Sequence, residues 1–363
     1  MLLKNTVLYN SHIKLNALMA EFAGWNMPIH YGSIIEEAKH TRSKTSVFDI
    51  THMGEFLVEE NMSSPSLDKL ITNPVSKMKE KTCRYGFLLN EAGGVLDDLI
   101  VYRLSAGEWM VVVNAGTIEK DEQAIKTNLS KNAKFKNISE NIVKLDVQGP
   151  TSFEVMKSIV GEPLRKLKYF QFDEFEFLGG KYIVSRTGYT GELGYEIYID
   201  ASKGLELWEM LLKHPDVKPA GLGARDILRL EAGLPLYSDE LTEDTSPVEA
   251  GMEKFIDFEK DFVGKGALLK QINNVSRKLV GLSVEGRRTP RHTNKILVNN
   301  IEKGIVTSGV FSPHLNKGIA FGYIATEQAK EGTKVIIDTG KGTIEATITI
   351  PPFIKETSIR KQL

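Results

Sequence analysis

The chain has 363 residues and a mass of 40.5 kDa, more than one hydrophobic core usually serves, so we expect about two to three domains. Apolar residues make up 41% and charged residues 26%, which excludes an intrinsically disordered chain. The 46 Lys and Arg residues balance 47 Asp and Glu residues, so the net charge of -1 provides no overall field that would attract nucleic acid.

The cysteine content and the apolar runs bear on the cellular compartment. Cys83 is the single cysteine, so the chain forms no internal disulfide and no multi-cysteine metal site, which is typical of a reducing compartment. No apolar run approaches the roughly 18 residues of a membrane span. The first residues have the pattern of neither a secretory signal nor a transit peptide. We therefore expect a cytoplasmic bacterial protein.

Residues from about 49 to 140 have the alternating strand and helix signals of a self-contained α+β module. The apolar patterns predict short helices at 66–71 and around 118–129, and strands at 54–59, 84–89, 95–104 and 109–113. A glycine-containing turn at 90–94 joins the second strand to the third.

The remainder of the chain divides into a mixed region and a β-rich region. Residues 144–148 read as a strand that leads through Gly149 and Pro150 into a helix, because proline suits the first helical turn. Strands are predicted at 181–186 and 194–200, and helices at 205–212 and 224–232. From about residue 278 onward, short β-rich runs broken by Gly and Pro predict an all-β unit.

Familiar catalytic signatures are missing from the sequence. It contains no glycine-rich dinucleotide fingerprint, phosphate loop, serine-hydrolase elbow or zinc-protease motif. Four of the seven histidines lie within the first 52 residues, but their spacing matches no metal-ligand pattern, so we interpret them as structural and assign no metal.

The acid pair Asp97-Asp98 interrupts an apolar run, where a half-buried strand would normally avoid charge. Side chains alternate faces along a strand, so one carboxylate can face a pocket while the other reaches solvent or a basic partner. An acid pair satisfied by nearby backbone N–H groups at the end of a hairpin is an equally good interpretation of this run alone.

Two further segments allow both a functional and a structural interpretation. The loop at 186–192 combines small, conformationally permissive residues with an aromatic and charges; it suits either close approach to a flat ligand or a tight surface connection. Arg225 and Arg229 are four residues apart on one helix face, which suits a carboxylate-bearing ligand, or pairing with Asp226 and Glu231.

Several blocks of sequence share a pattern with one known family. They are residues 22–28 (FAGWNMP), 49–56 (DITHMGEF), 93–99 (GGVLDDL), 185–192 (SRTGYTGE) and 221–226 (GLGARD), with further matches at 261–265 and 307–313. In this order they closely resemble the T-protein of the glycine cleavage system, a tetrahydrofolate-dependent aminomethyltransferase. The resemblance extends over essentially the whole chain.

The resemblance implies an α+β fold in which three domains form a ring around a central folate pocket. The expected units are a first α+β folate-binding domain made of residues 1–49 plus 141–245, a ferredoxin-like inserted module at 50–140, and a C-terminal β-rich, jelly-roll-like domain at 246–363. The implied reaction takes an aminomethyl group from the dihydrolipoyl arm of the H-protein to tetrahydrofolate. Ammonia leaves, and methylenetetrahydrofolate and reduced H-protein are the products.

The resemblance also implies roles for individual residues. Asp98 corresponds to the catalytic acid beside the reacting nitrogens of the pterin, where a carboxylate stabilises developing positive charge and assists proton transfer. Glu196 corresponds to the acid that binds the polar edge of the pterin. The other positions implied in folate binding are Met53, Tyr85, Val113, Asn114, Tyr189, Arg229 and Arg360. Residues 354–358 depart from the family pattern, which affects the assignment of Arg360.

Two alternatives share this scaffold. A related folate-dependent demethylase would act on a sulfonium or methylamine donor, and its sequence would look similar; the continuous T-protein blocks count against it. A non-catalytic folate-binding accessory protein of iron–sulfur assembly would carry a cysteine motif near residues 260–265, where this chain has none.

Overall fold

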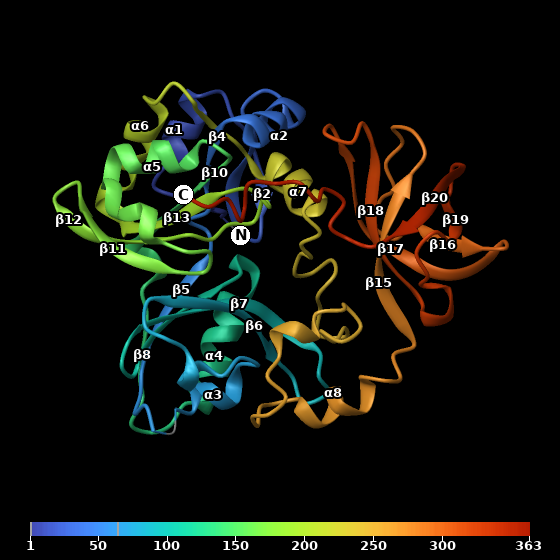
Figure 1. Cartoon of the computed structure of the whole chain (residues 1–363), viewed down its shortest axis with the longest axis horizontal. Coiled ribbons are helices and arrows are strands. Elements are labelled where there is room, and N and C mark those ends of the chain that lie inside the picture. The colour runs from blue at the N-terminus through green and yellow to red at the C-terminus, as the bar shows by residue number, and fades with distance from the viewer. Residues whose placement is uncertain (1, 64) are drawn as a thin grey trace.

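The computed structural model describes residues 2–63 and 65–363, and its strands form four sheets (Figure 1). The three larger sheets lie in three lobes arranged around the middle of the molecule. No helix in the described part of the chain combines the length and the apolar content of a membrane span. Short 3-10 turns lie at Val75–Lys77, Ala115–Thr117, Ser139–Asn141, Glu162–Lys166, Ala201–Lys203, Glu253–Phe255 and Thr326–Gln328.

The first lobe is built on a six-stranded sheet of order β11-β12-β13-β10-β4-β14. Its strands are β4 (Thr45–Asp49), β10 (Ile142–Gln148), β11 (Phe172–Phe177), β12 (Gly180–Ser185), β13 (Gly194–Asp200) and β14 (Val217–Pro219). β4 pairs directly with β10, so the chain before residue 50 and the chain after residue 141 share one sheet. The predicted strand at 194–200 has the bounds of β13.

Helices and a small sheet complete the first lobe. The small sheet has the order β1-β3-β2. The elements are β1 (Lys4–Asn5), β2 (Leu18–Phe22), β3 (Trp25–His30), α1 (Tyr9–Lys14), α2 (Ile34–Ser43), α5 (Ser152–Val160), α6 (Gly204–Leu212) and α7 (Leu222–Glu231). The helix predicted after Pro150 begins at Ser152, so the proline precedes the first turn rather than lying within it.

The two faces of β10 differ in chemistry although both are buried. Leu145 and Val147 point into the apolar core shared with α5 and α6. Lys144 and Asp146 alternate with them and therefore point to the opposite face, where they are 1% and 0% exposed. Because buried charges must be paired, this second face has to hold a polar network.

The second lobe is a five-stranded sheet of order β6-β7-β8-β5-β9 with two helices. Its elements are β5 (Gly54–Glu59), α3 (Leu67–Leu70), β6 (Thr82–Leu89), β7 (Val95–Ser105), β8 (Glu108–Val113), α4 (Ile118–Asn128) and β9 (Lys134–Asn137). Odd-numbered β7 residues such as Leu99 share an apolar cluster with Ile125 of α4. The even-numbered Tyr102 packs against Phe172 and Tyr198 of the first lobe, so this face of β7 lies at the junction of the two lobes.

The third lobe is a closed six-stranded antiparallel barrel of order β15-β18-β17-β16-β19-β20. Its strands are β15 (Arg277–Val284), β16 (Lys295–Val298), β17 (Ile301–Ser312), β18 (Lys317–Ala325), β19 (Lys334–Asp338) and β20 (Thr343–Thr349), preceded by α8 (Lys265–Gln271). The α+β class and the C-terminal β-rich unit are confirmed. Where we expected a jelly-roll-like arrangement, the six strands close into one barrel, which leaves no sheet edge in this lobe.

The connecting segment and the C-terminal tail join the lobes. Leu241, Val248 and Phe262 of the connection pack against Phe87 and Val95 of the β6–β7 hairpin. After the barrel, the tail returns to the first lobe (Figure 1), where the backbone N–H groups of residues 353 and 354 donate to the carbonyl oxygen at the end of α7. The middle of the molecule is thus bordered by all three lobes and closed by a tail that contacts α7.

Candidate active site

Asp98 lies on β7, on the face that is turned toward the first lobe, and is half-buried. Its Oδ2 accepts a hydrogen bond from the hydroxyl of Tyr85 at 2.9 Å, and its Oδ1 accepts one from the Nδ2 of Asn114 at 2.9 Å. Tyr85 comes from the neighbouring strand β6, and Asn114 directly follows β8. Three of the residues predicted for the site are therefore in direct contact.

The surroundings of Asp98 disfavour its negative charge. Burial, and then the nearby charge of Asp97, raise the pKa of Asp98 to about 7, although Tyr85 and Asn114 stabilise the charged form. A carboxyl with a pKa near neutrality is populated in both protonation states, which suits a group that exchanges a proton with substrate.

Asp97 points to the other side of β7 and is fully buried. Its Oδ2 accepts from the backbone N–H of Asn114 at 3.0 Å, and its Oδ1 accepts from the Nδ2 of the same residue at 2.8 Å. The amide of Asn114 therefore bridges both acids. We expected the second acid to reach solvent or a basic partner; it faces the α4 side of the sheet instead, because both flanking faces of β7 are covered.

Glu196 lies on β13, directly opposite Asp146 of β10, so two carboxylates share one buried face of the sheet. Like charges in such cross-strand pairs are destabilising unless cations compensate them. Lys144 Nζ lies 3.1 Å from Glu196 Oε1, and Thr187 donates its hydroxyl hydrogen to Oε2. Although burial opposes ionisation, the charge of Lys144 and the bond from Thr187 lower the pKa of Glu196.

Asp146 receives its own cation from α7. Arg225 Nη1 lies 2.6 Å from Asp146 Oδ2, and the guanidinium carbon of Arg225 lies 5.0 Å from the centroid of the Tyr189 ring. Burial raises the pKa of Asp146 to about 7 in spite of this partner. The Tyr189 hydroxyl donates to the carbonyl oxygen of Pro235. The loop at 186–192 thus lies between the sheet, α7 and the connecting segment.

Close packing explains the glycine in this loop. Gly188 has a φ of +153°, and a Cβ placed there would lie 2.1 Å from the side-chain nitrogen of Gln148. Gln148 Nε2 donates to the carbonyl oxygen of Thr187 at 3.0 Å, and Gln148 Oε1 accepts from the Thr190 hydroxyl at 2.6 Å. The loop is therefore held against the sheet and is not a free surface connection.

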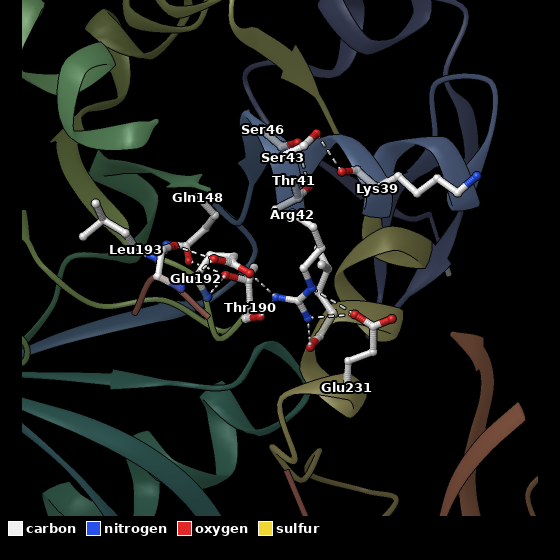
Figure 2. A network of polar contacts seen from close by, with 12 residues as sticks. Lys39, Thr41, Arg42, Ser43, Ser46, Gln148, Thr190, Glu192, Leu193 and Glu231 are labelled. Atoms are coloured by element: carbon white, nitrogen blue, oxygen red, sulfur yellow. Dashed lines mark hydrogen bonds and ion pairs between the residues drawn. The ribbon is translucent and has the colours of Figure 1, made fainter. Parts of the chain in front are cut away.

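Figure 2 shows a second anchor of the same loop, centred on Arg42 of α2. Its Nη1 donates to the carbonyl oxygen of Thr190 at 2.6 Å and to Glu192 Oε1 at 2.9 Å. Its Nε and Nη2 both donate to Glu231 Oε2, at 3.0 and 2.8 Å, and Nη2 also reaches the carbonyl oxygen of Leu228 at 3.1 Å. We call these contacts the Arg42 network; one guanidinium ties α2 and α7 to the loop.

The tail and the barrel extend this network. The other oxygen of Glu192 accepts from the backbone N–H of Ser358 at 3.0 Å and from its hydroxyl. The other oxygen of Glu231 accepts from the Ser312 hydroxyl, at the end of β17, at 2.5 Å. The first lobe, the barrel and the C-terminal tail therefore meet at two buried carboxylates.

Met53 lies beside the Lys144–Glu196 pair, whereas the Val113 side chain lies in the apolar cluster on the α4 side of the second sheet. Lys144 Nζ, which pairs with Glu196, lies 3.6 Å from Met53 Sδ. Val113 is fully buried opposite Gly54. Glu55, on the same strand as Gly54, is 1% exposed, and burial raises its pKa to about 8. An apolar thioether thus borders the charged pair on the junction side.

Two predicted arginines have polar or charged neighbours other than Asp98. Arg229 is 1% exposed and its guanidinium is bonded to Asp226 and Glu240, at 2.8 Å each, and to Ser308 at 2.8 Å. Arg360, in the tail, is exposed, and its charge acts on the nearby Tyr169. The predicted folate-binding roles of Arg229 and Arg360 remain predictions.

The sequence interpretation did not single out Lys144 or Asp146. The sequence nevertheless indicated a charged face at these positions, because charged residues alternate with apolar ones in a strand that leads directly into a helix. Along β7, Tyr102 follows Asp98 by four residues on the same face, about 13 Å further along the strand, and its hydroxyl lies 3.5 Å from Glu196 Oε2. Asp98 and Glu196 therefore lie at two ends of the junction between the lobes, with an apolar cluster that includes Ile100 and Tyr102 between them.

Comparison with known proteins places this chain in a family. Residues 8–260 match the GCVT N-terminal domain, and residues 277–355 match the glycine cleavage T-protein C-terminal barrel domain. The chain belongs to the glycine cleavage T-protein family. It is 42% identical over 361 residues to an aminomethyltransferase of Caldanaerobacter subterraneus subsp. tengcongensis, covering 98% of this chain and 96% of the relative. It is 41% identical over 357 residues to an aminomethyltransferase of Halothermothrix orenii, covering 97% and 100%.

A solved structure agrees with the sequence matches. The glycine cleavage system aminomethyltransferase T of Bartonella henselae superposes with a TM-score of 0.93 at 33% identity, covering 98% of this chain and 99% of that one. The predicted family and the aminomethyltransferase class are confirmed. Within residues 2–63 and 65–363, no group of three or more His, Cys, Asp or Glu side chains is arranged to hold a metal ion.

Proposed function

We propose that this T-protein family member transfers the methylene carbon of an aminomethyl group, carried on the dihydrolipoyl arm of the H-protein, to tetrahydrofolate, with release of ammonia. The observation that carries the proposal is Asp98, a half-buried carboxyl that is fixed by Tyr85 and Asn114 and has a pKa of about 7. Full-length similarity to aminomethyltransferases favours this reaction over demethylation and over a non-catalytic accessory role.

Asp98 would act by charge and by proton transfer. When ionised, a fixed carboxylate stabilises positive charge that develops on the carbon being transferred, without reorganising during the reaction. When protonated, the same group can return the proton to a leaving amine. A pKa near neutrality gives access to both roles, and the two hydrogen bonds hold the carboxylate in one orientation.

The residues present suit tetrahydrofolate as the co-substrate. The oxygens of Glu196 retain lone pairs beyond those used by Lys144 and Thr187, so this carboxylate can accept the adjacent N–H donors of a pterin edge. Met53 and the Tyr189 ring would provide apolar and aromatic walls for a flat ligand. Val113 would line the site through its backbone next to Asn114, because its side chain packs on the α4 side. Arg229 and Arg360 would act on the folate path and near the folate tail.

We also propose the division of the chain into residues 1–49 plus 141–245, 50–140 and 246–363. The pairing of β4 with β10 supports the discontinuous first unit. Segment 248–268 packs on the hairpin of the second lobe, so in this division the third unit includes an arm that reaches the second. The expected location is the bacterial cytoplasm.

The decisive experiment supplies aminomethylated H-protein and tetrahydrofolate and measures ammonia and methylenetetrahydrofolate. Asp98→Asn keeps the volume and removes the charge, so we expect turnover to fall by about 100-fold or more while the fold is retained. The matched control is Asp173→Asn, a partly exposed acid on the surface that pairs with Lys81, and it should keep full turnover. Equal turnover by Asp98→Asn and wild type would remove Asp98 from catalysis.

A further inference from the structure

A third acid lies behind the candidate catalytic carboxyl. Asp121 belongs to the first turn of α4 and is 0% exposed. It lies one helical turn before Ile125, which packs with Leu99, so it is on the helix face that covers the side of β7 bearing Asp97. Within residues 2–63 and 65–363, no N–H or O–H group donates to either carboxyl oxygen of Asp121 under standard geometry. The Thr117 hydroxyl, which lies nearby, is donated to the carbonyl oxygen of Asn114 at 2.9 Å.

A single proton shared between Asp97 and Asp121 would remove the conflict between these two buried acids. An ionised carboxylate only accepts hydrogen bonds, so two ionised acids in contact would leave a buried, repelling and unsatisfied pair. One proton placed between them converts the repulsion into an O–H···O⁻ hydrogen bond and gives Asp121 its missing donor. Burial, and then the charge of Asp121, raise the pKa of Asp97 well above its usual value, while burial raises that of Asp121 to about 6. These values describe the pair as a unit.

We propose that Asp97 and Asp121 share a single proton and, through the amide of Asn114, form a positioning pair that sets the charge state of Asp98. Asn114 Nδ2 donates to Asp97 Oδ1 at 2.8 Å and to Asp98 Oδ1 at 2.9 Å, so one amide connects the pair to the candidate catalytic acid. This inference rests on the proposed role of Asp98. Neither Asp97 nor Asp121 is assigned contact with substrate.

The shared proton decides how much negative charge Asp98 experiences. With one proton, the pair carries a charge of about −1, part of it remote on α4; without it, a second negative charge would stand beside Asp98 and raise its pKa further. The other titratable groups near the pair have partners of their own or stay neutral. Lys120 of α4 pairs with Glu243 at 2.7 Å and donates to the Tyr237 hydroxyl, and burial raises the pKa values of Tyr237 and Tyr85, which keeps both phenols neutral.

Two isosteric variants should move the charge in opposite directions. In Asp121→Asn the new amide donates to Asp97, which ionises, so the negative charge moves next to Asp98. In Asp97→Asn the new amide donates to Asp121, so the remaining charge stays on α4. If ionised Asp98 supports turnover, the acid limb of the pH–rate profile should shift up by about one pH unit in Asp121→Asn and down by a similar amount in Asp97→Asn.

The kinetic test measures aminomethyl transfer by the full-length chain from pH 5 to pH 9. Glu119→Gln is the matched control, because it removes a charge from the same helical turn at an exposed position and should leave the limb unchanged. Opposite shifts in the two variants support the pair. A uniform loss of turnover with an unshifted limb in both would mean a purely structural role and would overturn the proposal.

An infrared measurement tests the proton without using turnover. The spectra are taken at neutral pH in an Asp98→Asn background, so that Asp98 contributes no carboxyl band of its own. A protonated carboxyl band should then be lost in both Asp97→Asn and Asp121→Asn and kept in Glu119→Gln. If neither variant loses such a band, no shared proton exists and the proposal fails. If the band is lost as expected but the wild type transfers no aminomethyl group, the acid pair stands and the proposed function fails.

Discussion

Replacing Arg42 by Met should be among the most destabilising single changes in the chain. It would leave two buried carboxylates, Glu192 and Glu231, with 5% and 1% of their side chains exposed, without their common cation. Breaking a buried ion pair by removing one partner costs about 3–5 kcal/mol. Two carboxylates and two carbonyl groups depend on this guanidinium, so we expect Arg42→Met to lower the free energy of unfolding by about 4–5 kcal/mol.

This loss of unfolding free energy can be converted into a fall in melting temperature. At about 2.1 cal/mol/K of unfolding entropy per residue, it corresponds to a fall in Tm of about 5–7 °C for a chain of this length. Differential scanning calorimetry of the full chain measures it. Lys39→Met, on the same helix, is the control, because the Lys39–Glu36 pair is 52% and 69% exposed and contributes about 0.5 kcal/mol at most.

A third variant separates charge from packing. Adding Glu192→Gln and Glu231→Gln to Arg42→Met neutralises the stranded acids, and the triple variant should regain part of the lost Tm. If Arg42→Met melts within 1 °C of Lys39→Met, the Arg42 network contributes little to stability and the argument from buried charge is wrong.

Three further predictions concern the site and its surroundings. Glu196→Gln should weaken tetrahydrofolate binding without unfolding the chain, because an N–H donor would face the donors of the pterin edge; unchanged affinity in calorimetric titration would exclude Glu196 from the site. The folded-state pKa of Glu55, about 8, lies above its unfolded value, so the folded chain binds the extra proton and the free energy of unfolding should fall as pH rises from about 4.5 to 8. Glu55→Gln should flatten that slope in urea titrations at pH 5 and pH 8, and a slope equal to the wild type would contradict the assignment. Reversing the charge of either of two basic clusters should lower the association rate with H-protein and weaken its dependence on salt, whereas rates insensitive to salt and to both reversals would place docking elsewhere. The clusters are Arg287, Arg288, Arg291 and His292, and Lys355, Arg360 and Lys361.

The acid pair on β7 illustrates what a single sequence can predict. Strand periodicity alone indicated that Asp97 and Asp98 face opposite sides, and the structure places Asp98 on the junction face and Asp97 on the α4 side. The expected environment of Asp97 was wrong, because periodicity says which face a side chain takes and not what covers that face. Its partner Asp121 is 24 positions away on another element.

The charged face of the first sheet shows a second limit of what a single sequence can predict. Asp146 and Glu196 lie opposite each other only because β10 pairs antiparallel with β13 in one register. Strand periodicity in 142–148 can predict a buried side, but the pairing of Lys144 with Glu196 depends on a contact across 52 positions of sequence. The partners of Arg42 are further still, at separations of up to 189 residues. Local patterns carry little information about such pairs, whereas family blocks locate the candidate site directly.

The contact between Glu192 and Ser358 also constrains how the protein is made. The two residues are 166 positions apart, and the loop that bears Glu192 is completed by a serine of the tail that follows the barrel. At about 5–20 residues per second, a ribosome needs roughly 10–30 s to synthesise the intervening stretch. During that interval the first lobe can form its sheet from β4, β10 and β13, yet its glycine-containing loop still lacks the serine that binds Glu192. The loop of the candidate folate site is therefore completed only after residue 358 has been synthesised, well after the sheet that carries it can form.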